Sequence, residues 1–109
     1  MQNHRLIDER SLALGKAVAE RLRREPDLVR LAQANIERWS KTCSPRGRST
    51  LEEWAAVLGG PIEETIALLI GDDERAVRLR QSNPFAGALP QKVRNEILLQ
   101  FQARDQTAT

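Results

Sequence analysis

The chain has few of the residues that carry most enzyme chemistry. Of its 109 residues one is cysteine, one is histidine and none is tyrosine, and aromatic side chains make up 4%. A single cysteine excludes an intrachain disulfide framework and suits a reducing compartment. Scarce aromatic rings argue against a module that stacks nucleic-acid bases.

Catalytic and metal-binding patterns are also missing. The histidine, His4, and the cysteine, Cys43, have no evident base or orienting partner in the sequence. No metal-ligand spacing and no phosphate-binding glycine loop occurs. We therefore expect no enzymatic activity, no cofactor and no metal.

Long apolar runs are absent as well. No stretch approaches the roughly 20 apolar residues that span a bilayer. Asp8, Glu9 and Arg10 follow soon after the start, where a secretory signal would be apolar. We expect a cytoplasmic protein without membrane contact. Its formal net charge of +2 is too mild to indicate a nucleic-acid partner.

The hydrophobic residues recur at helical spacing and show no lasting β alternation. This pattern predicts a single all-α domain over residues 1–109, a compact bundle of five to six helices with flexible ends at 1–4 and 105–109. Proline and glycine separate the helices. The predicted helices cover residues 5–24, 27–39, 51–58, 61–70, 74–81 and 90–104.

Residues 43–49 are predicted to form a loop because they contain a proline and a glycine among polar residues. Two overlapping capping-box patterns, Ser49 with Glu52 and Thr50 with Glu53, place the next helix start near Leu51. Arg46 and Arg48 lie in this loop and are candidates for nucleic-acid or anion contacts.

The third and fourth predicted helices form a helix-turn-helix-like pair in the middle of the chain. Ala56, Gly60 and Ile66 have the spacing of such a unit. However, the second helix of the pair begins with Glu63 and Glu64, which phosphate would repel. Ordinary helix packing is therefore favoured over DNA binding. This helix is apolar around most of its circumference, so it is either central in the bundle or covered by a second chain.

The segment 79–90 places an aromatic ring and a guanidinium group in a rigid connection between helices. Pro84 fixes the approach to Phe85, and Gly87 permits a positive φ. In one interpretation the ring fills the core. In the other, it inserts into a partner's cleft. The candidate partner-binding residues are Arg75, Arg78, Arg80, Gln81, Ser82 and Phe85.

Arg75 and Arg78 share a helical face, and two interpretations stay open for them. They could be solvated charges paired with carboxylates, or bidentate donors to a partner. Trp39 and Trp54 lie on apolar stripes and are predicted core residues. Asn35, one turn before Trp39, is predicted to make a buried polar contact there.

The order of features along the chain resembles that of small bacterial antitoxin-type proteins. These features are a charged first helix, a Pro-Asp start to the second, a Trp in each of the next two segments, and then the run Leu79-Arg80-Gln81-Ser82-Asn83-Pro84-Phe85-Ala86-Gly87. The resemblance covers most of the chain. It implies a toxin encoded by the adjacent gene, which this protein would bind and silence, and a role in repressing its own operon. Glu63 and Glu64 depart from the pattern of a DNA reader.

These observations predict a non-catalytic, antitoxin-like adaptor that covers a functional surface of a partner with residues 75–89. The first alternative is a small transcriptional regulator whose phosphate contacts come from Arg46 and Arg48. The second is a structural subunit that forms homo-oligomers through the fourth helix.

Overall fold

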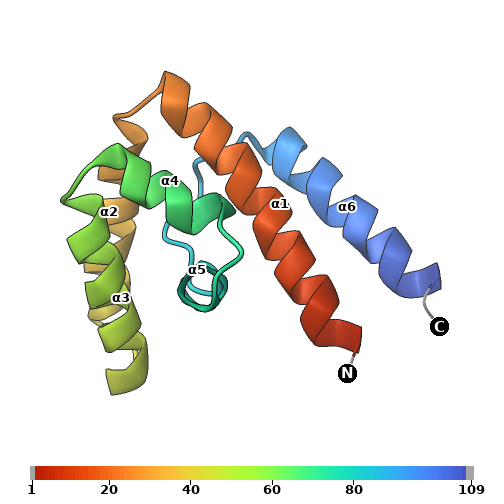
Figure 1. Cartoon of the computed structure of the whole chain (residues 1–109), viewed down its shortest axis with the longest axis horizontal. Coiled ribbons are helices and arrows are strands. Elements are labelled where there is room, and N and C mark those ends of the chain that lie inside the picture. Colours follow the sequence, from red (N-terminus) through yellow and green to blue (C-terminus); the bar gives the residue numbers. More distant parts are fainter. Residues whose placement is uncertain (1, 108–109) are drawn as a thin grey trace.

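The computed structural model describes residues 2–107, and the side chains of residues 5–102. Met1, Ala108 and Thr109, parts of the ends predicted to be flexible, lie outside this range. The described chain is all-helical, as predicted, and forms a compact bundle (Figure 1). Its helices are α1 (Gln2–Arg24), α2 (Leu28–Ser40), α3 (Pro45–Leu58), α4 (Ile62–Ile70), α5 (Glu74–Arg80) and α6 (Gln91–Thr107).

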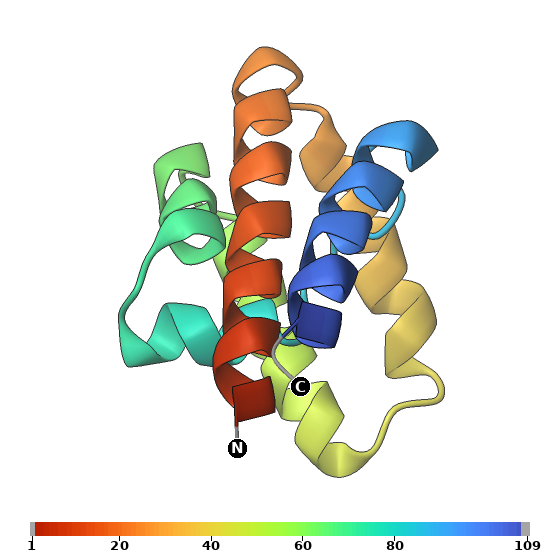
Figure 2. The same ribbon diagram turned by 90° about the vertical axis from the view of Figure 1, so that its right-hand side faces the viewer.

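The long helix α1 organises the bundle. It packs against α4 and α5, and separately against α6, which runs antiparallel beside it (Figures 1 and 2). Helices α2 and α3 form a hairpin, and α3 packs against α4. No helix in the described part of the chain is both long and apolar enough to cross a membrane.

A glycine permits the close approach of α1 to α4. A Cβ built on Gly15 would overlap the carbonyl oxygen of Leu69 and would lie 3.2 Å from the Cδ atom of Arg80. Without a side chain, Gly15 lets the two backbones meet almost directly. The position of α4 on α1 therefore depends on this residue.

The core lies where helices α1 to α5 converge. Trp54 is completely buried, as predicted, and its Nε1–H donates to the carbonyl oxygen of Leu79 at 2.8 Å. This bond satisfies the polar atom of a large buried ring. Trp39 is only half-buried and packs at the edge of the core. The other core residues include Val18, Leu22, Leu51, Val57, Leu58, Leu68, Leu69 and Leu79.

The predicted start of the third helix is wrong. Helix α3 begins at Pro45, with Ser44 as its N-cap: the Ser44 Oγ accepts a hydrogen bond from the Gly47 backbone N–H at 3.1 Å. Proline suits the first helical position because that N–H needs no partner. The predicted capping hydroxyl of Thr50 donates instead to the carbonyl of Arg46 at 3.5 Å. Arg46 and Arg48 consequently lie in the first turns of a helix, not in a loop.

Candidate functional site

The connection after α5 is folded back against α2 by one asparagine. The Asn35 Nδ2 donates to the carbonyl oxygens of Pro84 (2.8 Å) and Ala86 (2.9 Å). Arg38 donates to the Asn35 Oδ1 at 2.7 Å, which fixes the amide in this orientation. Asn35 is 3% exposed, so these buried polar groups are all paired. The polar contact predicted for Asn35 exists, but it holds the loop and not Trp39.

Phe85 points inward, because this clamp turns the loop toward the core. The ring is 3% exposed, and it lines a small, partly open hollow together with Leu14 and Val18 of α1. Gly87 has a φ of 90°, the left-handed conformation that lets the chain turn back after the ring. The prediction that Phe85 reaches outward to a partner is wrong, and its alternative, a residue filling the core, is correct.

Arg80 is also buried, with 4% of its surface exposed. Its Nη1 donates to the carbonyl oxygen of Leu68 at 2.8 Å, in the last turn of α4. The negative end of the α4 dipole stabilises a cation at this position. Burial lowers the pKa of the Arg80 guanidinium, and the negative charges of Asp8, Asp73 and Asp72 oppose that shift. The prediction that Arg80 contacts a partner is therefore wrong as well.

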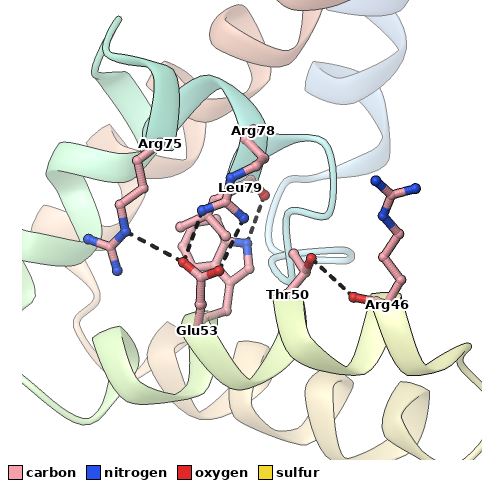
Figure 3. Close-up of polar contacts among 7 residues, drawn as sticks. Arg46, Thr50, Glu53, Arg75, Arg78 and Leu79 are labelled. Carbon is pink, nitrogen blue, oxygen red and sulfur yellow. Dashed lines mark hydrogen bonds and ion pairs between the residues drawn. The ribbon is translucent and has the colours of Figure 1, made fainter.

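Arg75 and Arg78 are exposed and converge on one carboxylate (Figure 3). Arg78 donates from both Nη atoms to the two Glu53 oxygens at 3.1 Å, and the Arg75 Nε lies 3.6 Å from Oε2. The cluster ties α5 to α3. It matches the interpretation of surface arginines paired with carboxylates, and leaves one net positive charge.

The Glu53 cluster predicts a dependence of stability on pH. Chiefly the hydrogen bond from Arg78 lowers the pKa of the Glu53 carboxyl. A carboxyl whose pKa is lower in the folded state stabilises the fold above its ordinary pKa, about 4.3, and loses that contribution as pH falls through the lowered value. We expect the urea midpoint of Glu53→Gln to be slightly lower than that of the wild type at neutral pH. At a pH below the lowered pKa of Glu53, the two midpoints should be equal.

Urea unfolding over a pH series would measure this effect, with Glu52→Gln as the control. Glu52 is exposed and has no ion pair within the described residues. A gap between wild type and Glu53→Gln that stays constant down to strongly acidic pH would contradict the assignment.

Two of the predicted partner-binding residues, Gln81 and Ser82, lie at an open groove. The groove has a volume of about 330 Å³, and one wall is formed by the α2–α3 corner and the other by the segment after α5. Gln81 is exposed and donates to the Asp8 Oδ1 at 2.9 Å, while Ser82 is half-buried. The lining residues are Trp39, Cys43, Gly47, Leu51, Gln81, Ser82 and Asn83.

Arg46 and Arg48 lie on α3, on either side in the sequence of Gly47, which lines this groove. The Arg48 Nη2 donates to the carbonyl oxygen of Ser40 at 3.0 Å, so its guanidinium joins the start of α3 to the end of α2. Arg46 is exposed and projects from α3 apart from the Glu53 cluster (Figure 3). Asn83, two residues before the buried Phe85, lines the same groove as Gln81 and Ser82.

The helix pair α3–α4 does not present a basic reading surface. Glu63 and Glu64 are exposed in the first turn of α4, and Ala56 is exposed rather than packed in the pair. Among the side chains the structure describes, no three metal-ligating residues cluster; His4 lies outside that set. No family model, curated protein or solved structure matches this chain.

Proposed function

We propose that this protein is a non-catalytic, antitoxin-like binding module that covers a functional surface of a partner protein through the groove beside Ser82. One observation carries the proposal: the groove joins Gln81 and Ser82 of the antitoxin-like run to the half-buried indole of Trp39. Aromatic and arginine side chains at a concave surface are the types that anchor protein interfaces. The module would act in the cytoplasm, where Cys43 stays reduced.

This proposal replaces the predicted set of contact residues. Arg80 and Phe85 are buried just before and just after the groove-lining residues 81–83, so they would support that wall from inside. Gln81 and Ser82 would face the partner. The exposed Arg46 and Arg48, on either side of the lining residue Gly47 in the sequence, would add positive charge. The exposed glutamates of α4 weigh against the alternative of a DNA-binding regulator, since they would repel phosphate at the helix that should read bases.

Co-expression with the product of the adjacent gene tests the proposal. We expect the two proteins to purify together, and Ser82→Arg to reduce the recovered partner at least about tenfold because the long side chain fills the groove. Gln33→Arg is the matched control: it adds the same charge at an exposed position of α2 that does not line the groove. Both variants should keep the wild-type thermal melt.

Equal recovery of the partner with Ser82→Arg and Gln33→Arg would reject the groove as the binding surface. Tight, salt-sensitive binding to the upstream DNA, without partner binding, would favour the regulator. A stable homo-oligomer in light scattering that needs neither ligand would favour the structural subunit.

A further inference from the structure

We propose that the groove binds an acidic segment of its partner that inserts one large apolar side chain against Trp39 and Leu51. This inference rests on the proposed function and specifies the chemistry of the partner. It follows from two properties of the groove, an apolar floor and a basic wall.

The floor of the groove can receive an apolar side chain. Leu51 is 5% exposed and belongs to the core, and the half-buried Trp39 packs against the same core. Cys43, also half-buried, adds a third weakly polar surface. A hollow of about 330 Å³ lies at the small end of the range for ligand pockets. Its size therefore suits one or two inserted side chains.

One wall of the groove, the α2–α3 corner, is rich in positive charge. Residues 38–51 contain Arg38, Lys41, Arg46 and Arg48 and no acidic residue. Because the whole chain has a net charge of +2 and this segment has +4, the rest of the chain has −2. The cations are therefore concentrated on the α2–α3 corner, which forms one wall of the groove.

Two of these cations are free to bind a ligand. Lys41 and Arg46 are exposed, and neither side chain has a hydrogen bond or ion pair within the described residues. By contrast, the charge of Arg78 is offset by Glu53. Charge complementarity at the border of an interface selects the partner and accelerates encounter. The carboxylates of an acidic peptide would pair with these cations, while its apolar side chain would pack against Trp39 and Leu51.

A peptide fits this groove better than a nucleic acid does. Single-stranded nucleic acids need successive aromatic side chains on which bases stack, and Trp39 is the one aromatic residue that lines the groove. The floor is completed by Leu51, whose branched side chain offers contact to an apolar side chain rather than hydrogen bonds to a base edge.

Nuclear magnetic resonance can test the inference, because the two indole N–H signals report on different places. The Trp39 ring lines the groove, whereas the Trp54 N–H is bonded internally to Leu79. We expect the peptide Glu-Asp-Leu-Phe-Asp-Glu to shift the Trp39 signal in a saturable, salt-sensitive manner. The Trp54 signal should stay in place. The same peptide with lysines for its acids, or serines for Leu-Phe, should not bind.

Charge reversal provides the matched variants. Lys41→Glu with Arg46→Glu should weaken binding of the acidic peptide at least about tenfold, since two favourable charges become repulsive. Arg23→Glu with Arg24→Glu makes the same change in net charge at exposed positions near the end of α1 and should leave the affinity within about twofold, because those charges lie away from the groove.

The other outcomes overturn the inference in distinct ways. Equal binding of acidic and lysine-containing peptides at Trp39 would remove the acidic requirement and leave the proposed function standing. A Trp39 signal that no peptide moves would reject peptide binding, and the co-expression experiment with Ser82→Arg would then decide the proposed function separately. Stronger binding of a single-stranded oligonucleotide at Trp39 would replace the peptide by a nucleic acid.

Discussion

Gly15→Ala is expected to lower the free energy of unfolding by about 3 kcal/mol, the upper end of the usual cost of overpacking. The added methyl group would overlap the Leu69 carbonyl oxygen, which is backbone within α4 and cannot turn aside as a side chain could. It would also press on the stem of Arg80, 3.2 Å away. Helix α4 must therefore move off α1, and the hydrogen bond from Arg80 to Leu68 would be lost with it.

Gly59→Ala is the control for this substitution. A Cβ at Gly59 would have its nearest neighbours at 3.7 Å, and the residue has a right-handed helical conformation with a φ of −80°. Alanine there should leave stability unchanged or raise it by up to about 1 kcal/mol, since it restricts the unfolded chain. Urea unfolding monitored by circular dichroism would measure both variants. Similar urea midpoints for Gly15→Ala and Gly59→Ala would show that the backbones of α1 and α4 do not meet at Gly15.

The second large effect is expected for Phe85→Ala, at about 3 to 5 kcal/mol, as for other buried aromatic residues reduced to alanine. The ring is 3% exposed, so its removal would cost apolar burial and would deepen the partly open hollow that it lines with Leu14 and Val18. Phe85 lies in the same connection as the groove-lining residues 81–83. The variant should therefore lose partner binding only under conditions where it also unfolds.

Leu99→Ala is the matched apolar truncation at the surface. Leu99 is 61% exposed on α6, so its loss should change stability by less than about 0.5 kcal/mol. Urea midpoints and thermal melts would compare the two. A Phe85→Ala protein that melts like the wild type while failing to hold its partner would restore the outward role that the sequence suggested for this ring.

Most helices could be predicted because apolar periodicity and helix-breaking residues agree along the chain. Pro26, Gly71 and Pro90 mark ends that the structure reproduces closely. The start of α3 was misplaced because Ser44, Ser49 and Thr50 are all acceptable N-caps. The capping residues alone do not show which one the chain uses. The presence of Pro45 directly after Ser44 was the signal that favoured the earlier start.

The candidate site was harder to predict because it depends on contacts between distant residues. Whether Arg80 points outward is decided at Gly15, where α1 comes close enough to enclose the guanidinium stem. Whether Phe85 points outward is decided by Asn35, on another helix. One sequence signal was available: Asn35 is a polar residue on the apolar stripe of its helix, as expected for a side chain with a buried partner.

The pair of hydrogen bonds from Asn35 has a consequence for how tightly the groove can hold a ligand. It fastens the backbone just after Asn83 to α2, the helix that also carries Trp39. Both walls are thus set before a ligand arrives, so little loop entropy is lost on association. Such preorganisation improves affinity without any additional contact, which allows a small recess to retain a short segment of another protein.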